Sequence, residues 1–107
     1  MILFIGMGEI LLKIHESYRW VVAVCDKEVF GRKLIDGKRV LDLSGRFFEG
    51  DLMSEDKARE EIIRCAREDA TFNFAGKDSV ALAKELGLVT DEGVVMIEGV
   101  PFALVLL

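Results

Sequence analysis

Residues 9–26 decide the fold, and they read EILLKIHESYRWVVAVCD. The apolar residues at every second position from Ile10 to Ile14 suit a strand, but the same stretch extended to Tyr18 also has one apolar helical face. Trp20–Cys25 is apolar, rich in valine and too short for a helix, so it predicts a strand that is covered on both faces. Residues 9–19 therefore form either the partner of this strand in a hairpin or a helix.

The two alternatives imply different functions. A helix over Glu9–Arg19 would follow the glycines Gly6 and Gly8, and Asp26 would then lie where dinucleotide-binding proteins place their ribose ligand. However, Leu11 stands where those proteins have a third, small residue that lets the helix pack on the sheet. We favour the hairpin, in which Asp26 begins a turn. A nucleotide-binding enzyme remains the alternative.

Turn and capping signals predict the elements that follow. They are a hairpin around Asp36-Gly37, a helix from the N-cap Ser54 to about Ala70, a helix from the N-cap Asp78 to Leu86 with Gly87 at its end, and closing strands at Val94–Ile97 and Pro101–Leu107. Strands that alternate irregularly with two helices predict an α+β fold with a mixed, largely antiparallel sheet. The length of 107 residues predicts a single domain over 1–107.

Charge and composition exclude several functions. The net charge is −5, which disfavours duplex DNA as a ligand. Arg32, Lys33, Lys38 and Arg39 form a local basic group that could contact RNA, but Asp36 interrupts it, and we interpret it as a solvated edge. No apolar run reaches the length of a membrane span, and no basic region precedes the first apolar residues as in a signal peptide. We expect a cytoplasmic protein that does not bind membranes.

Three residue types add context. Cys25 and Cys65 each lie in an apolar run without further ligands nearby, so we expect two buried thiols in a reducing compartment and no metal or other cofactor. The chain has no Gln, and Asn73 is its only Asn. Few amides together with 31% charged residues are typical of proteins from thermophiles.

The sequence suggests a ligand site at Asp26, Asn73, Gly76 and Lys77. Gly76-Lys77 begins a predicted helix and resembles a phosphate loop, although Thr71 and Asp78 occupy positions that such a loop reserves for other residues. Free amides beside Gly76 leave room for a small anion. Asn73 lies between two phenylalanines in a predicted loop, where it either satisfies buried backbone groups, which we favour, or faces a ligand.

Other polar residues are weaker candidates. His15 is the only histidine, and its charged neighbours favour an exposed strand position over a catalytic base. The acids Asp26, Glu28, Glu49 and Asp51 have no spacing typical of a calcium loop, so we interpret them as turn formers. We assign no catalytic or metal-binding residue.

The last six residues suggest self-association. Phe102–Leu107 carries no charge, so it must form a buried strand or pair with another copy of the chain. The residues expected to mediate a homo-oligomer are Phe102, Leu104 and Leu106.

Several segments, in this order, resemble a small archaeal family known as domain of unknown function 424. They are residues 23–31 (AVCDKEVFG), 48–50 (FEG), 73–76 (NFAG), 85–89 (ELGLV) and 99–101 (GVP). The resemblance runs from about Glu9 to the C-terminus and implies a cytoplasmic archaeal protein with a mixed sheet and two helices, but no established activity. In that family a His often follows the last motif, where this chain has Phe102.

These observations favour a non-catalytic binding or assembly module in the archaeal cytoplasm, with a protein or RNA partner in translation. The alternative is a small-ligand or nucleotide-binding enzyme that uses Gly6, Gly8 and Asp26, or Asn73 and Gly76.

Overall fold

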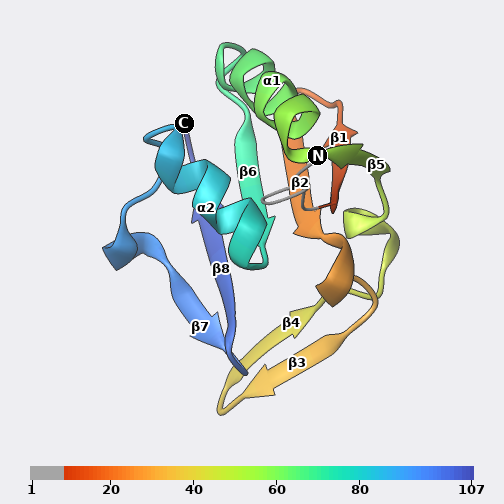
Figure 1. The fold of residues 1–107 in the computed structure, drawn as a ribbon, viewed down its shortest axis with the longest axis vertical. Coiled ribbons are helices and arrows are strands. Elements are labelled where there is room, and N and C mark those ends of the chain that lie inside the picture. Colours follow the sequence, from red (N-terminus) through yellow and green to blue (C-terminus); the bar gives the residue numbers. More distant parts are fainter. Residues whose placement is uncertain (1–8) are drawn as a thin grey trace, which may run out of the picture.

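The computed structural model describes residues 9–107 and contains a six-stranded sheet with both helices on one side (Figure 1). The sheet order is β5-β1-β2-β6-β8-β7, and β3 and β4 form a separate two-stranded ribbon. The elements are β1 (Glu9–His15), β2 (Val21–Asp26), β3 (Lys33–Asp36), β4 (Arg39–Asp42), β5 (Asp51–Ser54), α1 (Glu55–Ala66), β6 (Thr71–Ala75), α2 (Lys77–Glu85), β7 (Val95–Ile97) and β8 (Val100–Val105). Three short 3-10 turns, η1 (Lys27–Val29), η2 (Arg46–Phe48) and η3 (Asp91–Gly93), complete the chain.

The ambiguous segment is a strand. β1 pairs antiparallel with β2, so that Ile10 lies opposite Asp26 and His15 opposite Val21, and β5 pairs with the other edge of β1. Pairing along both edges satisfies backbone groups that an isolated helix would have to satisfy internally. The hairpin prediction is confirmed and the helical alternative is wrong. Gly6 and Gly8 lie outside the described residues.

Only one neighbouring pair in the large sheet is parallel. β2 and β6 run in the same direction, whereas β6 with β8 and β8 with β7 are antiparallel. The sheet is therefore mixed and largely antiparallel, and the α+β prediction is confirmed. The uncharged C-terminal segment forms an interior strand, because β8 is paired along both edges by β6 and β7.

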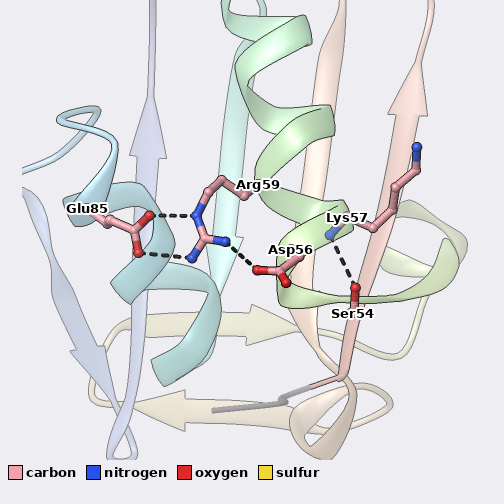
Figure 2. A network of polar contacts seen from close by, with 5 residues as sticks. All are labelled: Ser54, Asp56, Lys57, Arg59 and Glu85. Carbon is pink, nitrogen blue, oxygen red and sulfur yellow. Dashed lines mark hydrogen bonds and ion pairs between the residues drawn. The ribbon is translucent and has the colours of Figure 1, made fainter.

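The first helix begins as predicted. The Ser54 hydroxyl accepts a hydrogen bond from the amide of Lys57 at 3.2 Å, and the helix ends at Ala66, four residues earlier than expected (Figure 2). Arg59 then joins the two helices, because its guanidinium donates to both carboxylate oxygens of Glu85 at 2.6 and 3.1 Å and to Asp56 at 2.8 Å (Figure 2). Such a two-point contact fixes the orientation of α2 against α1.

The second helix needs a correction. Its N-cap is Gly76 and not Asp78. The carboxylate of Asp26 in β2 accepts the free amides of Asp78 and Ser79, so the helix needs no capping side chain of its own. The C-terminal prediction is confirmed, since Gly87 has the left-handed φ of 74°.

The sheet has a core on each side. The core under the helices contains Phe72, Phe74 and Ile62, and the core on the opposite side, beneath the ribbon and η2, contains Cys25 and Leu34. Both thiols are buried and free, Cys65 in the first core and Cys25 in the second. Burial, with a smaller contribution from the adjacent Asp26 charge, raises the pKa of Cys25 to about 12, so this thiol is unreactive at neutral pH.

Candidate functional site

The carboxyl ends of the two parallel strands meet at one end of the sheet. Cys25 of β2 pairs with Ala75 of β6, so the next residues, Asp26 and Gly76, lie side by side where α2 begins. Open sheets with parallel strands bind their ligands at this kind of position, beside a helix N-terminus. The geometry of Asp26 and Gly76 therefore decides whether a ligand can bind here.

Asp26 occupies the anion position itself. Its Oδ2 accepts the amide of Asp78 at 3.0 Å, and its Oδ1 accepts the amide of Ser79 at 2.8 Å and the Ser79 hydroxyl at 2.7 Å. The side chain is 1% exposed, so the contact is sealed from solvent. A carboxylate that binds the free amides of a helix and is countered by its dipole occupies the place of a bound phosphate.

Gly76 makes this close approach possible. Its φ is 109°, and a Cβ at this position would lie 2.3 Å from Cγ of Asp26. Its amide donates to the carbonyl of Pro101 at 2.9 Å, which ties the turn to β8. Only glycine combines this backbone conformation with contact to the carboxyl group.

Burial dominates the ionisation of Asp26. Loss of hydration raises the pKa of the carboxyl group, and the hydrogen bonds from Ser79 and Asp78 lower it by less. The folded state thus holds a proton on Asp26 more tightly than the unfolded chain does. The stabilisation is fully present below the pKa of the unfolded chain, about 3.9, and is lost as the pH rises through the higher pKa of the folded state.

We therefore expect the wild type to lose stability, relative to Asp26→Asn, as the pH rises above about 4. Asparagine cannot ionise, so this variant lacks the pH dependence that Asp26 contributes. Urea unfolding of both proteins at matched pH values measures the difference. A wild type that gains stability relative to the variant over this range would show that the hydrogen bonds outweigh burial.

The remaining predicted site residues do not converge on Asp26. Asn73 lies in β6 and not in a loop, because the residues around it pair with both β2 and β8. It shares a face with its partner Ala23, whose side chain belongs to the core away from the helices. Asp26 faces α2 instead, so Asn73 and Asp26 lie on opposite faces of the sheet.

Lys77 is exposed at the start of α2. With Glu28, Arg32 and Glu98 it lines an open hollow of about 330 Å³ beside the η1 turn. This hollow is separate from the buried carboxylate contacts, since neither Asp26 nor Ser79 lines it.

The remaining findings concern His15, potential metal ligands and membrane-spanning helices. His15 lies in β1 as predicted but is half-buried, and its Nε2 lies 2.9 Å from the carbonyl of Phe47, on whose ring it stacks. Within residues 9–107 no group of three potential ligands could hold a metal ion, and no helix there is long and apolar enough to cross a membrane.

Ser79 is the residue that sequence reasoning missed. It is fully buried, and both its amide and its hydroxyl donate hydrogen bonds to Oδ1 of Asp26. The available signal was the acid at the end of the apolar run Trp20–Cys25: an acid there is buried with the strand and needs donors, which a following helix start can supply.

The fold and site define an α+β protein in which the carboxylate of Asp26, at the end of β2, caps α2. This helix follows β6, the parallel neighbour of β2. The chain belongs to the family described as "Protein of unknown function (DUF424)", whose model matches residues 14–107. It is also similar to a crystal structure of an uncharacterized conserved protein from Methanopyrus kandleri, with a TM-score of 0.80, 26% identity, and coverage of 92% of this chain and 93% of that one. No curated protein matches the sequence.

Proposed function

We propose that this protein is a non-catalytic assembly module that associates with a second copy of itself through the open face of β8. The observation that carries the proposal is the exposure of large aliphatic side chains at the C-terminal end, where Leu104 is 52% and Leu106 is 72% exposed. Contiguous exposed apolar side chains are typical of interaction sites. Leu107 is also exposed, at 43%.

The surroundings of Leu104 suit a self-complementary contact. Its cross-strand partner is Asn73, and Thr71, one pleat further along β6, lies on the same face; neither residue carries a charge. Two copies of a chain with a net charge of −5 repel each other over most of their surface. A neutral face is where two copies approach with the least electrostatic repulsion. A twofold axis then buries the same patch on both copies.

The three residues contribute differently. Phe102 is half-buried and packs against the core on the side away from the helices, so it holds β8 in place more than it offers free surface. Leu104 and Leu106 supply the exposed apolar area. We therefore place the centre of the contact at Leu104.

We expect the wild type to sediment as a dimer at micromolar concentration and Leu104→Lys to sediment as a monomer. Burying a lysine opposite its own symmetry copy places two like charges in a desolvated contact. Met96→Lys is the matched control, because Met96 is 51% exposed but lies beside Pro101, on the face opposite to Leu104. It should leave the dimer intact. A monomeric wild type, or a Leu104→Lys variant that folds and still dimerises, would contradict the proposal.

The proposed setting is the cytoplasm of a thermophilic archaeon. Its support is the similarity to the protein from Methanopyrus kandleri, together with the single Asn and the absence of Gln from the sequence.

A further inference from the structure

The segment that contains the β3–β4 ribbon, residues 27–46, carries a net positive charge in an otherwise acidic protein. Residues 27–46 contain six Lys and Arg against three Asp and Glu, a balance of +3, so the remainder of the chain, which totals −5, carries −8. The ribbon extends past the end of the large sheet (Figure 1). Such segregation favours an anionic partner at the ribbon and repels it elsewhere.

Most of these cations are available to a partner. Among the described residues, the ion pairs of residues 27–46 involve only Lys27, which binds Glu9 at 3.2 Å. The cations of this segment without an ion pair are Arg32, Lys33, Lys38, Arg39 and Arg46. Lysines and arginines elsewhere, such as Arg59 and Lys84, bind carboxylates of their own chain.

Two of the three acids of this segment, Asp36 and Asp42, accept hydrogen bonds from the protein's own backbone. Asp42 accepts the amide of Ser44 at 2.9 Å, and Asp36 accepts the amide of Glu98 at 3.3 Å. Glu98 in turn accepts the amide of Ile35 at 2.6 Å, which fastens β3 to the β7–β8 turn. Asp42 lies opposite Lys33 and Asp36 opposite Arg39, so these two cations are partly compensated, whereas Arg32 and Lys38 have no acid as cross-strand partner.

An apolar pair lies among the cations. Ile35 and Val40 are cross-strand partners and are 54% and 59% exposed, on the ribbon face that also carries Lys33. At the base of the ribbon, Arg32 and Lys77 line the open hollow described above, with Glu28 and Glu98. Arg32 and Lys38 at the two ends of the ribbon, with Lys33 beside the apolar pair, match a flexible strand that has both phosphates and unstacked bases.

We propose that the β3–β4 ribbon, with Arg32 and Lys77 at its base, binds the sugar–phosphate backbone of a single-stranded nucleic acid. The phosphates contact the unpaired cations, and the base faces contact Ile35 and Val40. A rigid duplex is disfavoured, because it would run past the ribbon along the acidic remainder of the surface. This inference is independent of self-association, since Leu104 lies on the large sheet and not on the ribbon.

The test measures binding of fluorescent 20-nucleotide RNA and DNA single strands, and of the corresponding duplexes, by anisotropy across a range of KCl concentrations. We compare the wild type with the triple variant Arg32→Ala, Lys38→Ala, Arg39→Ala. The control triple, Lys13→Ala, Lys57→Ala, Arg67→Ala, removes the same charge from exposed positions outside the ribbon. Thermal melts establish that both triples are folded.

We expect the ribbon triple to bind at least tenfold more weakly at low salt, and its slope of log K against log salt to flatten by about 2, since each phosphate contact contributes about 0.7 for single strands. The control triple should stay within about twofold of the wild type, and Ile35→Ala should weaken binding without changing the salt slope. The two single-strand arms identify which nucleic acid binds better.

Three results would overturn the proposal: no binding of either single strand at low salt, equal losses in the two triples, or equal affinity for heparin, which would indicate general attraction of polyanions.

Discussion

Gly76→Ala is expected to lower the free energy of unfolding by about 4 kcal/mol or more, which is a large part of the stability of a domain of this size. Two causes add. A φ of 109° is costly for any residue with a side chain, by about 1–3 kcal/mol. The new Cβ would also lie 2.3 Å from Cγ of Asp26, so either the carboxylate must leave the α2 amides or the turn must move away from Pro101.

Gly87→Ala is the matched control for this variant. Gly87 also has a positive φ, 74°, but a Cβ there would meet nothing within 4 Å, so only the backbone cost of about 1 kcal/mol applies. Urea unfolding of both variants measures the difference. Equal losses would mean that contact with Asp26 contributes nothing to the requirement for glycine.

Asp26→Ala is expected to cost about 3–5 kcal/mol at neutral pH, the second largest effect. The substitution leaves the amides of Asp78 and Ser79 and the Ser79 hydroxyl without their acceptor in a site closed to solvent. Each buried donor left without a partner costs about 1–3 kcal/mol, and relaxation of the helix end recovers part of this loss. Asp51→Ala, at an exposed acid in β5, should change stability by less than about 0.5 kcal/mol.

A double-mutant cycle with Ser79→Ala separates the shared hydrogen bonds from simple burial. Ser79→Ala removes the hydroxyl donor from wild-type Asp26, whereas in the Asp26→Ala background no acceptor is left for that hydroxyl. We therefore expect the serine substitution to be costly alone and nearly neutral in the double variant. Additive losses would show that the carboxylate and the hydroxyl act independently.

Local signals predicted much of the fold. The hairpin at Asp36-Gly37, the cap at Ser54 and the left-handed Gly87 were all predicted correctly, because each depends on the chemistry of a few adjacent residues. The strand at Glu9–His15 was the favoured of two interpretations. Over these seven residues the apolar positions fit both a helix and a strand. Only the pairing with β2 and β5 decides between them.

The candidate site was less predictable, since it depends on contacts distant in sequence. Asp26 and Ser79 are 53 positions apart and meet because β2 and β6 are parallel neighbours, a pairing that no local pattern encodes. For the same reason the sequence suggests Asp78 as the cap of α2, whereas the carboxylate of Asp26 in β2 accepts the free amides of the helix. The sequence suggests a loop at Asn73 because an amide side chain close to Gly76 is typical of turns, although Thr71–Ala75 alternates polar and apolar residues as a strand does.

The central claim is that Asp26 fills the anion position at the carboxyl ends of β2 and β6, so that no small ligand binds there. The most direct measurement is a thermal-shift screen of the wild type against mononucleotides, dinucleotides, inorganic phosphate and divalent ions. A ligand at a hundred times its dissociation constant adds about 2.7 kcal/mol, which corresponds to roughly ten degrees or more for a domain of about this size. We expect no shift of that size with any of these compounds. A shift of that size with a nucleotide or phosphate that Lys77→Ala leaves unchanged would contradict the claim, because Lys77 lines the separate hollow beside η1.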